Sequence, residues 1–146
     1  MRHTREMATL RRSLQLLRSF RFEQTHPEIF YGGLAEDTAG LVDNLGRDLG
    51  VRLPGARVLD VGGGPGYFAD AFARHGAHYV GLEPDAGEMS AAGIHLSNSV
   101  RGDGTNLPFA DDSFDVVYSS NVAEHIPNPW DMGEEMLRVT CLLYTS

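Results

Sequence analysis

The residues best suited to chemistry in this sequence are a carboxylate and a set of glycines that follow one short apolar stretch. Asp60 lies at the end of a strand predicted at residues 57–61, and Gly62, Gly64 and Gly66 come directly after it. A glycine has no Cβ, so a glycine-rich loop lets the backbone approach a ligand closely. We therefore expect the ligand to be a small molecule with a sugar or nucleotide part.

Further polar side chains stand where other predicted strands end. Glu83, Asp103 and Asn121 each follow such a strand. Any one of them could be a helix cap or a solvated loop residue. In an open α/β sheet, however, ligands bind at the carboxyl ends of the strands, beside the point where the strand order reverses. Their joint placement predicts a single shared site.

The elements that must position these residues alternate along the chain. Strands are predicted at 57–61, 78–82, 99–101 and 114–119, and helices at 67–74, 85–92 and 129–139. Strands that alternate with helices through short connections predict a parallel sheet with helices on both faces, a doubly wound α/β fold. The expected helix ends include a C-cap at Gly76 and an N-cap at Asn128, before Pro129.

Two more helices are predicted before the sheet, at residues 9–20 and 35–49. The second shows an apolar stripe at helical spacing, made of Leu41, Val42, Leu45 and Leu49. The segment at 22–33 between the two helices contains a proline, a glycine pair and several aromatic residues, and it is predicted as a turn or loop.

Composition excludes several classes of protein. Twelve basic and twenty acidic residues give a net charge of −8, which disfavours a general nucleic-acid binder. No apolar run approaches the roughly 18 residues of a membrane span, so no stable membrane insertion is expected and the predicted compartment is the cytoplasm. One cysteine and six histidines without ligand spacing predict no metal site.

The charges of the predicted site distinguish between two candidate ligands that contain a nucleoside. Glu83 lies seventeen residues beyond Gly66, where an acid can accept hydrogen bonds from both ribose hydroxyls. Residues 64–69 also satisfy the weak G-x-G-x-x-A pattern of dinucleotide sites, so an NAD(P)-dependent oxidoreductase remains an alternative. The carboxylate of Asp60 would repel a pyrophosphate, whereas it would attract the ammonium and sulfonium groups of S-adenosylmethionine.

With these motifs, residues 57–139 resemble the class I S-adenosylmethionine-dependent methyltransferases that act on small molecules and lipids. The motifs that carry the resemblance are Asp60-x-Gly62-x-Gly64-x-Gly66, Leu82-Glu83-Pro84-Asp85, the segment 102–109 and the segment 112–126. The resemblance implies a Rossmann-like fold with S-adenosylmethionine as cofactor. It also implies residue roles: Asp60, Gly62, Gly64 and Gly66 form the first motif, Glu83 holds the ribose, Asp103 and Gly104 meet the adenine, and Asn121 lies under the sulfonium.

The acceptor side is less defined by the sequence. His125 is the candidate general base, because an unperturbed histidine titrates near neutral pH. Tyr31 and His26 could close over the donor or the acceptor. Methylation of nucleic-acid bases is not expected, since residues 121–124 read Asn-Val-Ala-Glu in place of an Asn- or Asp-Pro-Pro-aromatic sequence. The predicted partner is a small-molecule or lipid acceptor; the sequence leaves the oligomeric state open.

Three segments are predicted. Residues 1–50 form an N-terminal helical segment and lid, 51–140 form a partial S-adenosylmethionine-binding domain, and 141–146 are a non-native tail. The family sheet normally has seven strands, of which about four are expected here. We expect such a fragment to be marginally stable. Three interpretations stay open: a methyltransferase, a nicotinamide oxidoreductase and a catalytically inactive nucleotide-binding domain.

Overall fold

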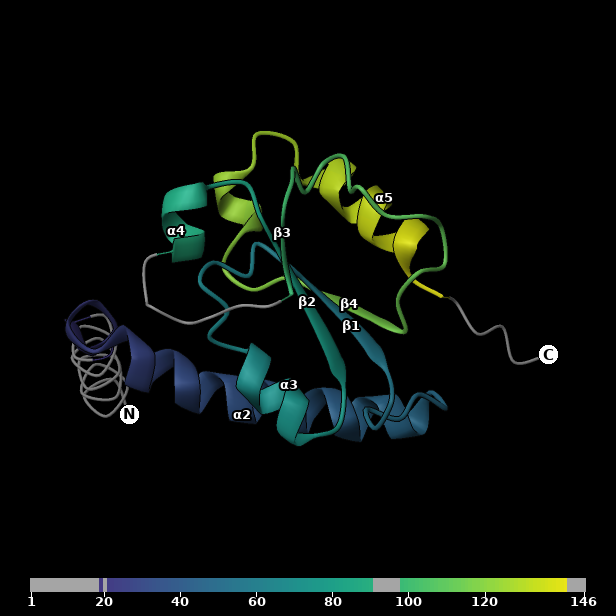
Figure 1. The fold of residues 1–146 in the computed structure, drawn as a ribbon, viewed down its shortest axis with the longest axis horizontal. Helices are drawn as coiled ribbons and strands as arrows, with labels where there is room; N and C mark the ends of the chain where they lie inside the picture. The colour runs from purple at the N-terminus through teal and green to yellow at the C-terminus, as the bar shows by residue number, and fades with distance from the viewer. Residues whose placement is uncertain (1–18, 20, 91–97, 142–146) are drawn as a thin grey trace, which may run out of the picture.

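The computed structural model describes residue 19 and residues 21–90 and 98–141 (Figure 1). The helix predicted at 9–20 lies outside this part except for residue 19, which is helical. The tail predicted at 141–146 likewise lies outside it except for Cys141. The division of the chain into three segments therefore stays a prediction.

The centre of the structure is a four-stranded parallel sheet. Its strands are β1 (Arg57–Val61), β2 (His78–Glu83), β3 (Ser99–Arg101) and β4 (Val116–Tyr118). The strand order is β3-β2-β1-β4, and each neighbouring pair is parallel. The order reverses between β1 and β4, which is where open α/β sheets bind their ligands. The prediction of a doubly wound sheet with about four strands is confirmed.

Helices lie on both sides of this sheet (Figure 1). They are α2 (Pro27–Asp48), α3 (Ala69–Arg74), α4 (Ala86–Ser90), the short 3₁₀ helix η1 (Ala123–His125) and α5 (Pro129–Val139). In Figure 1, α2 and α3 lie below the sheet and α5 lies above it. Within residues 19, 21–90 and 98–141, no helix combines the length and apolar character that a membrane span needs.

Alternation along β1 divides the core into two layers. Val58 packs toward α2 and α3, in a cluster that includes Phe72 and Tyr79. Leu59 points to the other face, in a cluster with Met132 and Val139 of α5. Successive strand residues point to opposite faces, so a strand buried on both sides needs apolar residues at every position. In Arg57–Val61 the last four residues are buried, and three of them are apolar; the exception is Asp60.

The first helix of the described fold corrects the sequence prediction. α2 begins at Pro27 rather than at residue 35, so most of the segment predicted as a loop at 22–33 is helical, and residues 21–25 are helical as well. Proline is favoured in the first turn of a helix, where its missing N–H costs nothing. The glycine pair that suggested a loop is tolerated because Tyr31, Leu34 and Ala35 pack on the core.

The apolar stripe predicted for this helix is confirmed on the core side only at Val42. Leu41, Leu45 and Leu49 are 57%, 55% and 73% exposed, whereas Ala35 and Ala39 are buried. The buried stripe runs through residues 31, 35, 39 and 42, at spacings of four, four and three. The small side chains of Ala35 and Ala39 face the core beside α3, and the three large leucines lie outside this contact.

Element ends agree with the sequence in most places. α3 and α4 lie within their predicted ranges, α5 matches its range, and Gly76 follows α3 with a φ of +78°. β4 is shorter than predicted, because Phe114 forms only an isolated bridge with Thr140. Asn128 precedes α5 but makes no side-chain hydrogen bond to it. The predicted N-cap position and the proline that follows it are thus confirmed, although the Asn128 side chain does not cap the helix.

Candidate donor-binding site

A cavity of about 570 Å³ opens at the carboxyl ends of the strands, beside the reversal of strand order. It is lined by eight of the nine residues predicted for the site: Asp60, Gly62, Gly64, Glu83, Asp103, Gly104, Asn121 and His125. Gly66 is the ninth, and it is not part of the lining. Its N–H donates to the carbonyl oxygen of Gly63 at 2.9 Å, so it closes the turn that shapes the loop.

The glycine loop is fastened to the end of β2. The N–H groups of Gly62 and Gly63 donate to the carbonyl oxygen of Leu82 at 2.8 and 3.1 Å. Gly62 has a φ of +81°, and a Cβ there would lie 2.2 Å from a methyl carbon of Val122. Gly64 has a φ of +51°, and a Cβ there would meet nothing within 4 Å. The loop thus requires glycine on conformational grounds at both positions and leaves open space beside Gly64.

Asp60 is buried at the floor of the cavity. Its Oδ2 accepts hydrogen bonds from the hydroxyls of Tyr79 and Tyr118, each at 2.7 Å. Burial raises the pKa of Asp60 to about 6, the two tyrosine hydrogen bonds oppose that rise, and the nearby charge of Glu83 adds to it. A buried carboxylate of this kind is stabilised as an anion when a cation arrives.

Sequence reasoning missed both tyrosines. Tyr118 is the direct neighbour of Asp60 in the β1–β4 register, and Gly81 is its neighbour in the β1–β2 register. Tyr79 lies two residues before Gly81 on the same face, and the absence of a side chain at Gly81 leaves room for the Tyr79 hydroxyl, 3.4 Å from where a Cβ would be. Two tyrosines on strands that flank a buried acid are the signal that could have found them.

Glu83 ends β2 and is held on both carboxylate oxygens by backbone. Its Oε2 accepts from the N–H of Gly64 and its Oε1 from the N–H of Asp85, both at 3.1 Å. The side chain is buried, at 9% exposure, and lies on the cavity wall. These contacts fix the carboxylate beside the glycine loop, where the resemblance places the ribose.

Asp103 is the exposed carboxylate of the site. Its Oδ1 accepts from the N–H of Thr105 at 2.8 Å and from the Thr105 hydroxyl at 2.9 Å, and these hydrogen bonds hold the pKa of Asp103 below its usual value. Gly104 is buried next to it, and a Cβ there would lie 3.1 Å from Val61 and 3.5 Å from Met132 of α5. The turn therefore presses its backbone onto the core beneath the cavity.

The far end of the cavity is aromatic. Tyr31 of α2 lines it and stacks on Tyr67, with ring centroids 4.9 Å apart and planes within 10°. The Tyr31 hydroxyl donates to Glu23 and also interacts with the side chain of Asn121, a residue with a φ of +58° after β4. Burial, with Glu23 as the next cause, raises the pKa of Tyr31 to about 12.

The two aromatic-segment residues named from the sequence thus separate. Tyr31 lies at the cavity, whereas His26 is exposed, stacks on Phe22 and is not part of the cavity lining. His26 instead occupies the N-cap position of α2, without a side-chain capping hydrogen bond. The prediction that His26 closes over a ligand finds no support in this arrangement.

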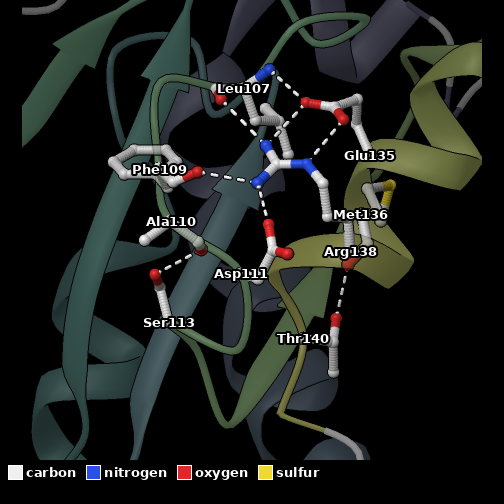
Figure 2. Close-up of polar contacts among 9 residues, drawn as sticks. All are labelled: Leu107, Phe109, Ala110, Asp111, Ser113, Glu135, Met136, Arg138 and Thr140. Carbon is white, nitrogen blue, oxygen red and sulfur yellow. Dashed lines mark hydrogen bonds and ion pairs between the residues drawn. The ribbon is translucent and has the colours of Figure 1, made fainter.

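The segment after Asp103 is tied to α5 by one arginine (Figure 2). The guanidinium of Arg138 donates from Nε and Nη2 to both carboxylate oxygens of Glu135, and from Nη1 and Nη2 to the carbonyl oxygens of Phe109 and Leu107. It also forms an ion pair with Asp111 at 2.7 Å. Arg138 holds the pKa of Glu135 down at about 2. No sequence motif singled out this network.

Comparison with known proteins gives this architecture a family. Residues 59–141 match the family described as the methyltransferase domain, and they make up more than half of the chain. The chain belongs to this family. Its resemblance to class I S-adenosylmethionine-dependent methyltransferases is thereby confirmed, and the oxidoreductase alternative is not favoured.

Individual relatives agree with this assignment. An uncharacterized methyltransferase of Mycolicibacterium gilvum is 59% identical over 138 residues, covering 91% of this chain and 54% of the relative. The YcgJ protein of Bacillus subtilis has a TM-score of 0.58 at 27% identity, over 71% of this chain and 46% of its own. An S-adenosylmethionine-dependent methyltransferase of Mesorhizobium loti has a TM-score of 0.53 at 26% identity, over 61% and 43%. This chain spans about half the length of the curated relative.

Proposed function

We propose that this chain supplies the S-adenosylmethionine-binding part of a methyltransferase that acts on a small-molecule or lipid acceptor. The observation that supports this most is the convergence of Asp60, Glu83 and Asp103, from the ends of three different strands, on one cavity with the glycine loop. A cationic ligand matches a cavity whose nearest charges are negative, whereas a pyrophosphate would be repelled by them.

The residues present fit such a donor. Gly64 faces open space with no side chain to fill it, and Glu83 is already held in place by backbone N–H groups. Asp60 would attract the positive charge of the methionine part, Glu83 would hold the ribose, and Asp103 with Gly104 would meet the adenine. When bound, S-adenosylmethionine supplies a methyl group on a positively charged sulfur that is already activated for displacement.

The protein then needs to align an acceptor and exclude water. Proximity and orientation of this kind can supply about 7 kcal/mol or more of the barrier reduction. Tyr31, Tyr67 and Ile126 give the cavity an aromatic and apolar end for an acceptor. Where the acceptor must lose a proton, His125 of η1 is the proposed base, since it too lines the cavity.

Charge bears on the class of acceptor. A net charge of −8 and acidic residues in the cavity argue against nucleic acid as the partner. Within the described part of the chain, no group of three or more His, Cys, Asp or Glu residues could hold a metal ion. We place the protein in the cytoplasm as part of this proposal, and we assign it no oligomeric state.

Calorimetric titration tests the donor assignment. We expect S-adenosylhomocysteine to bind the chain with 1:1 stoichiometry and NAD to show no saturable heat under the same conditions. Binding of NAD alone would overturn the proposal in favour of an oxidoreductase. Binding of neither compound would leave a nucleotide-binding fold without its ligand, and the proposed function would be wrong.

Methyl transfer needs a second experiment. Radiolabelled S-adenosylmethionine is incubated with a cell extract in the presence of the protein, and the organic-soluble and aqueous small-molecule fractions are counted. We expect label in one of those fractions, which then identifies the acceptor. Label found only in nucleic acid would contradict the proposed acceptor class.

A further inference from the structure

The described residues contain a second cluster of charge outside the cavity, centred on Arg138 (Figure 2). It gathers two carboxylates, Glu135 and Asp111, and two backbone carbonyl groups around one guanidinium. An arginine fork that satisfies a carboxylate with two N–H donors and also reaches backbone carbonyls holds its partners in a fixed geometry. The partners all belong either to α5 or to residues 107–111, so the cluster connects these two segments.

Leu107 is held at both of its backbone polar groups. Its N–H donates to Oε2 of Glu135 at 2.8 Å, and its carbonyl oxygen accepts from Nη2 of Arg138 at 3.1 Å. The Leu107 side chain is buried in the core, at 4% exposure. Without these two contacts, the backbone N–H and carbonyl groups of Leu107 would need water as their partner. The side chains of Glu135 and Arg138 therefore satisfy the hydrogen bonds that a neighbouring strand would otherwise make.

A single turn connects Leu107 to the donor-site residue Asp103. Between Asp103 and Leu107 the chain forms one tight turn, in which the N–H of Asn106 donates to the carbonyl oxygen of Asp103 at 3.1 Å. Thr105 donates twice to the Asp103 carboxylate within the same turn. At the start of the turn, Met132 of the same helix packs beneath Gly104. α5 thus supports the turn at both ends, through one apolar and one ionic contact.

From this arrangement we infer that Arg138 and Glu135 are positioning residues that set the orientation of Asp103 and Gly104, and hence the selectivity of the site for the adenine base. This inference rests on the proposed function. The two hydrogen bonds from Thr105 hold one oxygen of the Asp103 carboxylate within its exposed turn, but they do not fix how that turn lies over the cavity. A carboxylate that must recognise the adenine amino group needs such support from outside its own turn.

The test measures discrimination between two ligands. S-Adenosylhomocysteine carries an amino group at position 6 of the base, whereas S-inosylhomocysteine carries a carbonyl oxygen that a carboxylate would repel. We expect the unsubstituted chain to prefer the adenosyl ligand by about tenfold or more in Kd. Arg138→Gln should weaken binding of the adenosyl ligand by about tenfold and bring the preference close to one.

A matched control separates positioning from general stability. Arg57 forms a two-pronged ion pair with Asp115 at the other end of the sheet, away from the cavity, with Nε and Nη2 each 3.1 Å from a carboxylate oxygen. Arg57→Gln should lower the melting temperature and keep the preference for the adenosyl ligand. Arg138→Lys keeps the charge and loses the fork, so it should behave like Arg138→Gln.

Hydrogen exchange gives a readout that needs no ligand. The Leu107 amide, which donates to Glu135, should lose protection in Arg138→Gln and in Glu135→Ala, and should keep it in Arg57→Gln. Glu135→Ala also serves if Arg138→Gln does not fold. An unchanged ligand preference in every folded variant at Arg138 and Glu135 would overturn the inference. If the unsubstituted chain bound neither ligand, the proposed function would fail. Unchanged exchange of the Leu107 amide in the variants would show separately that Arg138 and Glu135 do not hold Leu107.

Discussion

Asp60 and Asp103 line the same cavity, but they are held by opposite means. Asp60 sits within β1, is 2% exposed, and is oriented by tyrosine hydroxyls from the two neighbouring strands. Asp103 lies on an exposed turn after β3, and its own turn and the Arg138 network on α5 support it. The sheet itself fixes the first carboxylate, whereas the second depends on its own turn and on a helix on the outer face that supports this turn.

This difference has an electrostatic counterpart. Burial raises the pKa of Asp60 to about 6, while hydrogen bonds from Thr105 lower the pKa of Asp103. The unliganded protein therefore resists a negative charge at one carboxylate and favours it at the other. A cationic ligand would have most to contribute at Asp60, where the anion lacks compensation. At Asp103 the contribution to ligand binding would come from a well-oriented hydrogen bond rather than from attraction between opposite charges.

The largest expected effect separates stability from binding at Asp60. Asp60→Asn keeps an acceptor oxygen for the tyrosines and removes the buried charge, so the free energy of unfolding at pH 7 should rise by on the order of 2 kcal/mol. The affinity for S-adenosylmethionine should fall by about tenfold to a hundredfold, because a charged hydrogen-bond partner is lost. Urea unfolding and calorimetry measure the two changes.

Asp103→Asn is the comparison for that variant. It should weaken binding without a gain in stability, since Asp103 is not buried. If Asp60→Asn and Asp103→Asn changed the free energy of unfolding equally, and the affinity for S-adenosylmethionine equally, the distinction between the two carboxylates would be contradicted.

A second effect is the opposite pH dependence of the two residues. Folded Asp60 holds its proton more tightly than the unfolded chain does, so its contribution to the free energy of unfolding should fall as pH rises from about 4 to about 6. Folded Asp103 holds its proton less tightly, so its contribution should be present above about pH 4 and be lost as pH falls further.

Urea midpoints measured from pH 3 to pH 7 show both effects. The slope between pH 4 and pH 6 should become more positive in Asp60→Asn, and the loss below pH 4 should shrink in Asp103→Asn. The groups that face Asp60 are Tyr79 of β2, Tyr118 of β4 and Glu83, and they remain in both variants. A slope left unchanged by Asp60→Asn would show that this carboxylate does not titrate in the range given by its burial.

A third, smaller effect concerns the tyrosines. The hydroxyl hydrogen bonds from Tyr118 and Tyr79, both 2.7 Å long, lower the pKa of Asp60. Tyr118→Phe should therefore raise that pKa further and reduce donor affinity at pH 7 by about 1 kcal/mol, the usual value of one hydrogen bond. Carbon-13 NMR titration of the Asp60 carboxyl group measures the shift. Tyr79→Phe is the comparison, and it should shift the pKa in the same direction.

The sequence predicted most of the scaffold because its signals were local. Arg57–Val61 was recognisable from a run of apolar residues before the glycines, and α5 from Pro129 at its start. Eight of the nine residues predicted for the site line one cavity, because the ends of parallel strands must meet, and their roles there stay predictions. α2 was misjudged because Gly32 and Gly33 signal a loop locally, whereas the segment is a helix whose neighbouring residues Tyr31, Leu34 and Ala35 pack on the core.

The supporting residues could not be found in the same way. Tyr79 and Tyr118 meet Asp60 only through the register of three strands, which comes from pairing rather than from any one segment. Arg138 reaches Leu107 across 31 positions of sequence. Spacing along a helix relates Arg138 to Glu135, but nothing in the sequence indicates which loop the pair would hold.

The smallest expected effect concerns Asp103, the exposed carboxylate of the two. Thr105→Val removes the hydroxyl that donates to Asp103 and keeps the backbone N–H that donates to the same oxygen. One of two local hydrogen bonds remains and α5 still supports the turn, so the affinity for S-adenosylhomocysteine should fall by only about twofold to threefold. Calorimetry at pH 7 measures this change. A loss as large as that of Arg138→Gln would mean that the turn orients Asp103 by itself, and the contrast between a carboxylate fixed by its sheet and one fixed by a distant helix would no longer hold.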